Sequence, residues 1–101
     1  LHKGVHRNKR ENPVEREVEI VNRLGLHARA AAKLVTLASS FKADVRVRKD
    51  GREVSGKSIM GVMMLAAAQG SRITLVATGE DQTQALDALE KMVADRFGEE
   101  A

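Results

Sequence analysis

The fold is decided by residues 14–41, which read VEREVEIVNRLGLHARAAAKLVTLASSF. At the start of this stretch the apolar residues Val14, Val18 and Ile20 alternate with glutamates, which is the period of a strand with one buried face. After a turn the period changes, because apolar residues up to Phe41 then recur three and four positions apart. The stretch therefore predicts a half-buried strand, a turn and an amphipathic helix.

The next segments predict a hairpin and a second helix. Alternating residues lie on either side of Asp50-Gly51, a pair that tolerates the positive φ angles of a tight hairpin turn. Ser58 then opens an apolar stretch, and serine is a preferred N-cap because its hydroxyl accepts a hydrogen bond from a free amide of the first turn. We therefore expect two strands joined by a tight turn, followed by a helix over residues 59–68.

The end of the chain predicts one more strand and one more helix. Ile73, Leu75 and Ala77 give the alternation of a fourth strand, and Asp81 with Gln84 can cap a last helix. The element order is β-α-β-β-α-β-α. Four one-sided strands and three amphipathic helices predict an α+β fold, an open-faced two-layer β-sandwich in which the helices cover one face of a four-stranded antiparallel sheet.

Length and composition limit the kind of protein. A chain of 101 residues with 43% apolar residues forms one small domain, which leaves little room for a deep active-site cavity. The chain contains no cysteine, which excludes a disulfide framework, thiol catalysis and zinc sites built on cysteine. We therefore expect chemistry at the surface of a cytoplasmic protein.

The positive charge is confined to the start of the chain. Residues 1–14 hold Lys3, Arg7, Lys9 and Arg10 against Glu11, which accounts for the whole formal net charge of +3. Together with the lack of apolar periodicity, this predicts a basic, flexible extension over 1–14 and a formally neutral domain over 15–101. The domain has only two aromatic residues, both in core stripes, and no apolar run of membrane-spanning length, so we expect neither nucleic-acid binding nor membrane insertion.

One histidine of the predicted domain, His27, lies in the stretch 25–29, which reads GLHAR. At the start of the helix the amides of Ala28, Arg29 and Ala30 lack intrahelical partners, and the helix dipole adds partial positive charge. Neutral imidazole can attack phosphorus, and the Arg29 guanidinium would stabilise the phosphate. The stretch favours phosphoryl capture; the alternative is that His27 simply caps the helix.

A second stretch, residues 57–65, reads KSIMGVMML and carries more apolar side chains than one core-facing stripe can use. The residues expected to point outward are Ile59, Met60 and Met63, and those that can point to the sheet are Val62, Met64 or Leu65. Flexible methionine side chains suit a surface that packs against several partners, so the outward set predicts a docking patch. Phosphorylation of Ser58 would add negative charge at the start of this helix.

Other side-chain groups do not predict chemistry. Asp44, Asp50 and Glu53 alternate with basic residues around the hairpin, which is typical of a solvated charged face. His2 and His6 lie in a segment without helical patterning. We therefore expect no metal site and no cofactor.

The two motifs together resemble the histidine-containing phosphocarrier proteins (HPr family) of the phosphoenolpyruvate-dependent phosphotransferase system, over residues 15–97. The resemblance implies that His27 takes a phosphoryl group on Nδ1 from phosphorylated enzyme I and passes it to enzyme IIA proteins, with Arg29 stabilising the phosphate. It implies a carrier without turnover of its own, and we expect a monomer.

The resemblance also implies regulation and docking sites. Ser58 would be the target of an HPr kinase/phosphorylase. The shared partner-docking face would contain Ala32, Ile59, Met60 and Met63. Where the family often has proline after the arginine, this chain has Ala30, as in branches that serve nitrogen-related regulation, so sugar uptake and a regulatory phosphorelay both stay open.

A second resemblance offers a different class of function. Residues 22–26, which read NRLGL, followed by an alanine-rich helix, are similar to the ligand-binding turn of small-molecule regulatory domains of the ACT type. That alternative leaves His27, Arg29 and the Ser58 stretch unexplained.

Overall fold

The computed structural model describes residues 12–101, so residues 1–11 of the predicted extension lie outside the described residues. The elements in chain order are β1 (Val14–Glu19), α2 (Ala28–Ser39), β2 (Asp44–Lys49), β3 (Arg52–Ser55), α3 (Ile59–Met64), β4 (Arg72–Thr78), α4 (Gln82–Ala94) and the 3-10 turn η1 (Arg96–Gly98). The predicted β-α-β-β-α-β-α order is confirmed. Within residues 12–101, no helix combines the length and the apolar character needed to cross a membrane.

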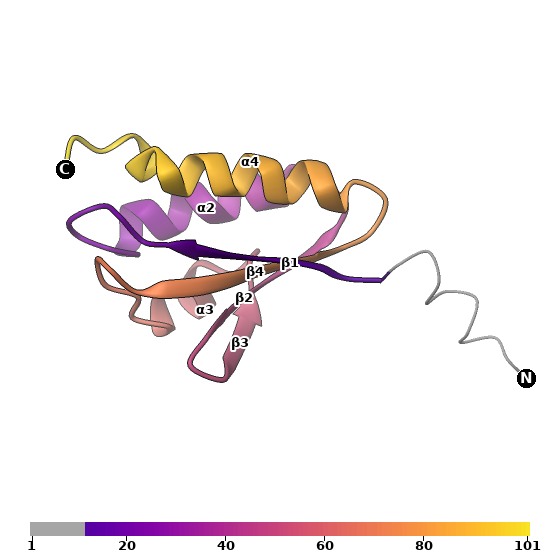
Figure 1. The fold of residues 1–101 in the computed structure, drawn as a ribbon, viewed down its shortest axis with the longest axis horizontal. Coiled ribbons are helices and arrows are strands. Elements are labelled where there is room, and N and C mark those ends of the chain that lie inside the picture. Colours follow the sequence, from indigo (N-terminus) through magenta and orange to yellow (C-terminus); the bar gives the residue numbers. More distant parts are fainter. Residues whose placement is uncertain (1–11) are drawn as a thin grey trace, which may run out of the picture.

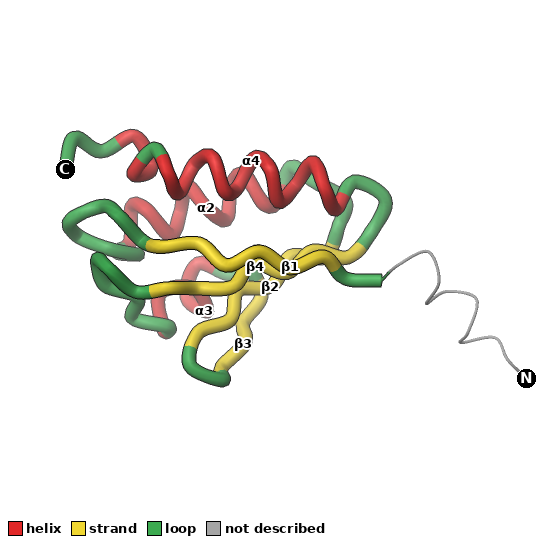
Figure 2. The backbone as a smooth tube through the Cα atoms, in the orientation of Figure 1, coloured by secondary structure: helices red, strands yellow, loops and turns green. Residues whose placement is uncertain are grey.

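The strands form one four-stranded sheet in the order β1-β4-β2-β3, and every neighbouring pair is antiparallel. Helices α2 and α4 lie side by side on one face of the sheet (Figures 1 and 2). Helix α3 packs against α2 and β3. The predicted open-faced α+β sandwich is confirmed.

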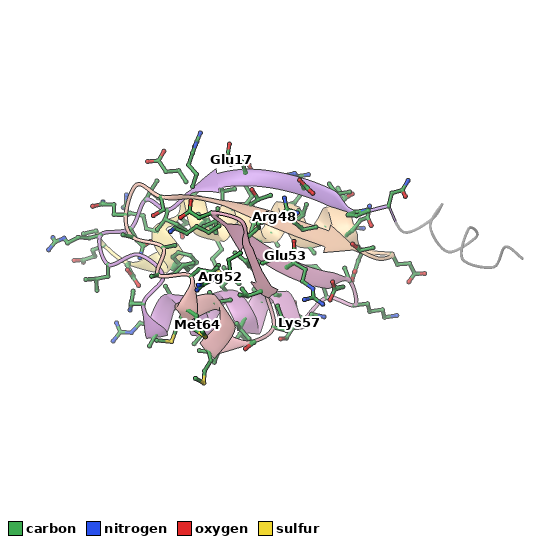
Figure 3. All side chains as sticks on the ribbon, turned by 90° about the horizontal axis from the view of Figure 1, so that it is seen from below. Glu17, Arg48, Arg52, Glu53, Lys57 and Met64 are labelled. Carbon is green, nitrogen blue, oxygen red and sulfur yellow. The ribbon has the colours of Figure 1, made fainter. Side chains whose placement is uncertain are left out.

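The core lies between the covered face of the sheet and the helices. It is built from the alternate strand residues and from one stripe of each long helix, among them Ile20, Val45, Val47, Ile73, Leu75, Leu34, Leu86 and Leu89. The other face carries charged side chains, and Figure 3 shows Glu17, Arg48 and Glu53 on it. Arg48 forms ion pairs with Glu15 and Glu53, both at 3.2 Å. Asp44, Asp50 and Glu53 are each paired with a basic neighbour and remain 57%, 84% and 45% exposed, which confirms the interpretation of the hairpin charges as a solvated face.

Helix α3 is shorter than the sequence predicts. The expected helix over 59–68 ends at Met64, because Ala66 has a φ of +51° and turns the chain away from the helix axis. Val62 and Leu65 are buried as expected, but Met64 is 63% exposed, so its placement toward the sheet is wrong.

The predicted cap of the last helix is also wrong. Asp81 is the N-cap residue of α4 but makes no capping hydrogen bond with its side chain. Its carboxylate instead accepts from the amides of Lys42 and Ala43, at 2.9 and 2.8 Å, and so ties the loop after α2 to the start of α4. The loop amides lower the pKa of Asp81, which keeps this carboxylate ionised as an acceptor.

The turn before α2 depends on a glycine. Gly25 has a φ of +68°, and a Cβ atom there would lie 2.4 Å from the carbonyl oxygen of Ala67 and 2.9 Å from Cα of Ala68. The next amide, of Leu26, donates to the same Ala67 oxygen at 2.9 Å. The turn that leads to His27 is therefore packed tightly against the chain that follows α3.

We predict that Gly25→Ala lowers the free energy of unfolding by about 3 kcal/mol or more, because it combines left-handed strain with a backbone clash. Gly51→Ala is the matched control: its φ is +81° and nothing lies within 4 Å of the added Cβ, so we expect a loss of about 1 kcal/mol. Urea unfolding of both variants measures the difference. Equal losses would contradict the close packing of the turn.

Candidate functional site

His27 is the N-cap residue of α2, and its imidazole makes no capping hydrogen bond. The first helical bond runs from the amide of Ala31 to the carbonyl oxygen of His27, at 2.8 Å. The amides of residues 28–30 precede this bond and have no hydrogen-bond partner within residues 12–101. The alternative in which His27 simply caps the helix is therefore wrong. Ala28 and Arg29 are exposed, so their amides are open to an acceptor from outside, whereas Ala30 is fully buried.

The imidazole of His27 is bonded on one side to the end of the chain. Its Nε2 lies 2.5 Å from Oε2 of Glu99, and the two side chains are 26% and 14% exposed. The other carboxylate oxygen of Glu99 accepts from Nδ2 of Asn22 at 3.0 Å. Asn22 is fully buried, and the same Nδ2 also donates to the carbonyl oxygen of Gly25 at 2.8 Å. One buried amide thus links the turn before α2 to Glu99.

The segment 97–101 is fixed beside this turn by further contacts. The Phe97 side chain is buried in the core, and its carbonyl oxygen accepts from Nζ of Lys33 at 2.7 Å. The amide of Arg23 donates to the carbonyl oxygen of Ala101 at 3.0 Å. Figure 1 shows the end of the chain at the same end of the molecule as the turn between β1 and α2.

The environment of Glu99 keeps its carboxylate ionised. The hydrogen bond from Asn22 is the largest influence and lowers the pKa of Glu99, against a smaller opposing effect of burial. The hydrogen bond from His27 and the positive charge of Lys33 lower the pKa of Glu99 further. An ionised carboxylate only accepts hydrogen bonds, so Nε2 of His27 must carry the proton and the lone pair of a neutral imidazole lies on Nδ1.

A shallow hollow of about 370 Å³ surrounds the imidazole. It is lined by Arg23, Leu24, His27, Arg29, Glu99, Glu100 and Ala101. The Arg29 side chain is exposed and makes no hydrogen bond or ion pair with any residue from 12 to 101. The site therefore combines a nucleophilic nitrogen, open helix amides and a guanidinium available to an anion.

The remaining predicted site residues lie in two other places. Ser58 caps α3, where its Oγ accepts from the amide of Gly61 at 3.1 Å, and Ile59, Met60 and Met63 are exposed on that helix. Ala32 is half-buried and lines a groove of about 490 Å³ between α2 and Met92 of α4. No residue of α3 lines this groove, so Ala32 and the α3 residues do not share one pocket.

Asn22 and Glu99 are the site residues that sequence reasoning missed. Asn22 lies in a recognisable turn, but no local pattern marks its amide as buried and bonded. Glu99 lies 72 positions from its partner His27, so only the fold brings the two together.

Comparisons with known proteins agree with this geometry. Residues 14–95 match the family model of the PTS HPr component phosphorylation site. The phosphocarrier protein HPr of Cupriavidus necator is 54% identical over 86 residues, which are 85% of this chain and 97% of that protein. The phosphocarrier protein NPr of Shewanella violacea is 44% identical over 86 residues, which are 85% of this chain and 94% of that protein.

Solved structures show the same fold. The crystal structure of an HPr from Thermoanaerobacter tengcongensis is 44% identical with a TM-score of 0.84, and the match covers 87% of this chain and 99% of that one. An HPr from Bacillus anthracis is 44% identical with a TM-score of 0.77, covering 79% and 95%. The family match decides against the ACT-like alternative.

We predict that Glu99 stabilises the fold in a pH-dependent way. Because folding lowers its pKa, its contribution is fully present above the unfolded pKa of about 4.3 and is lost as the pH falls through the lower folded pKa. Between about pH 6 and about pH 3, urea midpoints of Glu99→Gln should therefore fall less steeply than those of the wild type.

Glu100→Gln is the matched control, since Glu100 is exposed and makes no side-chain hydrogen bond within residues 12–101. It should follow the wild-type curve. A Glu99→Gln curve parallel to the wild type would contradict the bonding of Glu99.

Proposed function

The chain belongs to the HPr family of phosphocarriers of the phosphotransferase system, and we propose that His27 is the residue that carries the phosphoryl group. A protein of this family carries the group without catalytic turnover of its own. The observation that supports the assignment is the imidazole at the uncapped start of α2, with Nε2 bonded to Glu99 and no hydrogen bond to Nδ1 from residues 12–101. Family membership implies enzyme I as the donor and enzyme IIA proteins as acceptors.

The proposed transfer uses the groups of the hollow. The lone pair of Nδ1 forms a bond to phosphorus, while the bond from phosphorus to the donor group of enzyme I breaks and its electron pair stays on that group. The amides of the exposed residues Ala28 and Arg29 and the Arg29 guanidinium would stabilise the phosphoryl oxygens; Ala30, which the sequence also predicts as a donor, is fully buried. Onward transfer to an enzyme IIA protein reverses the roles, with His27 as the leaving group.

We predict that incubation with phosphoenolpyruvate and enzyme I adds about one acid-labile phosphate per chain, because the P–N bond of phosphohistidine breaks in acid. His27→Ala should take up none. Arg29→Ala should be phosphorylated more slowly, because the phosphate loses a charged donor. Mass spectrometry of intact protein before and after acid treatment measures both. Undiminished acid-labile phosphate in folded His27→Ala would contradict the assignment.

We further propose that Ser58 is a regulatory phosphorylation site for an HPr kinase/phosphorylase. Ser58 is exposed at the N-cap of α3, where the helix dipole tolerates the roughly two negative charges of a phosphate. Because α3 packs against α2, this charge would stand on the surface next to the helix that begins at His27. It would repel an acidic partner surface that docks there.

We predict that Ser58→Ala removes the acid-stable phosphate added by the kinase and also destabilises the protein by about 1 kcal/mol, because α3 loses its cap. Ser58→Asp retains a capping acceptor, so it should keep the stability while lacking the phosphate-accepting hydroxyl. Ser55→Ala, three residues before the site, is the control and should be modified like the wild type. Equal modification of Ser58→Ala and Ser55→Ala would contradict the site.

The proposed docking surface for enzyme I and enzyme IIA proteins contains Ile59, Met60, Met63 and Ala32. Met60 is 73% exposed, which is unusual for an apolar side chain that has no partner. Leu24 is exposed as well and lines the hollow at His27, so an exposed apolar side chain also lies beside the reacting group.

The pathway in which the chain carries phosphoryl groups is also a proposal. We propose that residues 14–101 act as one cytoplasmic, monomeric carrier domain, in sugar uptake or in a nitrogen-related regulatory phosphorelay. The domain starts one residue before the predicted boundary, because Val14 begins β1 and pairs with Ala77 of β4. Relatives named HPr and a relative named NPr both match the chain over most of its length. Ala30, where the family often has proline, is fully buried at the start of α2 and keeps its amide as a donor.

A further inference from the structure

We propose that Glu99 is a positioning residue for phosphoryl transfer: its carboxylate fixes the Nε2–H tautomer of His27 and stabilises the imidazolium that forms when Nδ1 takes the phosphoryl group. This inference rests on the proposed role of His27. The bond between Nε2 of His27 and Oε2 of Glu99, at 2.5 Å, is short for a hydrogen bond between nitrogen and a carboxylate.

Asn22 sets the direction of this bond. Its Nδ2 faces two acceptors, the carbonyl oxygen of Gly25 and Oε1 of Glu99, so the amide nitrogen must point toward both. Reversing the amide would place its oxygen against a carbonyl and a carboxylate. Because Asn22 is fully buried, the amide has no solvent to replace these bonds. Asn22 therefore always offers a donor to residue 99.

The chain around Glu99 is held in place independently of His27. The buried Phe97 side chain, with Lys33 on its carbonyl oxygen, anchors the segment on one side of Glu99. The bond from the amide of Arg23 to Ala101 anchors it on the other. The anchored backbone thus places the Glu99 carboxylate beside the imidazole. The Glu99 side chain therefore loses little conformational freedom when it forms the bond to Nε2.

The chemical effect follows from the charge of the ring. Forming the Nδ1–P bond turns a neutral imidazole into a cation, while its proton stays between Nε2 and Oε2. When the phosphoryl group leaves, the electron pair returns to Nδ1 and the ring is neutral again. A carboxylate on Nε2–H therefore interacts more strongly with the phosphorylated ring than with the free one.

The other charged side chains near the His27 ring make no hydrogen bond or ion pair with it within residues 12–101. Arg23, Arg29 and Glu100 line the hollow, and Lys33 acts on Glu99 through its charge. Among residues 12–101, only Glu99 makes a hydrogen bond or ion pair with the imidazole. The positioning effect therefore belongs to this one carboxylate.

Two substitutions of Glu99 distinguish a role in fixing the tautomer of His27 from a role in only holding the segment 97–101 in place. In Glu99→Gln, Asn22 holds the new carbonyl oxygen, so the new NH2 group faces Nε2, which must then accept. The proton moves to Nδ1 and the nucleophilic lone pair is lost. In Glu99→Ala, water replaces the side chain, both tautomers form, and Nδ1 is available part of the time. A positioning role thus makes glutamine worse than alanine.

The experiment measures the rate of phosphorylation by phosphorylated enzyme I and the nitrogen NMR shifts of the His27 ring in unphosphorylated protein. We expect the rate of Glu99→Gln to fall at least about tenfold and that of Glu99→Ala to fall less. The control Glu80→Gln, at an exposed residue between β4 and α4 that does not line the hollow, should keep the wild-type rate. The NMR shifts should report Nε2–H in the wild type and Nδ1–H in Glu99→Gln.

Two results would overturn the inference: a Glu99→Gln variant with the wild-type rate and tautomer, or a folded Glu99→Ala variant as slow as Glu99→Gln. A failure of the proposed function of His27 would give a different result from a failure of the positioning role of Glu99. In that case the wild type would take no phosphate on His27, whereas the tautomers would still be readable because their measurement needs no phosphate.

Discussion

The candidate site depends on one buried amide, the Nδ2 group of Asn22. A buried donor must be bonded, and its two acceptors come from parts of the chain far apart in sequence, the Gly25 carbonyl in the turn and the Glu99 carboxylate near the end. This requirement closes the turn before α2 and brings Glu99 to the imidazole of His27. The start of α2 can then remain uncapped, because the histidine that would cap it is bonded elsewhere.

A domain of this size fills its core between one face of the sheet and the helices, so the reacting group lies on the rim. The hollow at His27 is shallow, and one of the two arginines that line it, Arg29, makes no hydrogen bond or ion pair within residues 12–101. A carrier must release the group it accepts. An open site with donors on one side and exposed apolar residues nearby suits that task, because each partner protein supplies the remaining walls.

The sequence predicts what local periodicity controls. The strands, α2 and the stretch around His27 follow from residues that are neighbours along the chain. The wrong predictions concern structure that groups distant in the sequence determine. The Asp81 side chain does not cap α4, because it accepts from the amides of Lys42 and Ala43. Helix α3 is shorter than predicted, because Ala66 has a left-handed backbone conformation. Glu99 could not be predicted for the same reason, since a lone glutamate near the end of the chain has no pattern of its own.

The central claim is that Nδ1 of His27 accepts the phosphoryl group while Nε2 keeps its proton against Glu99. The most direct measurement is nitrogen and phosphorus NMR of the protein phosphorylated by enzyme I, which identifies the nitrogen bonded to phosphorus. We expect phosphorus on Nδ1 and a proton retained on Nε2. Phosphorus on Nε2, or on any other residue, would contradict it.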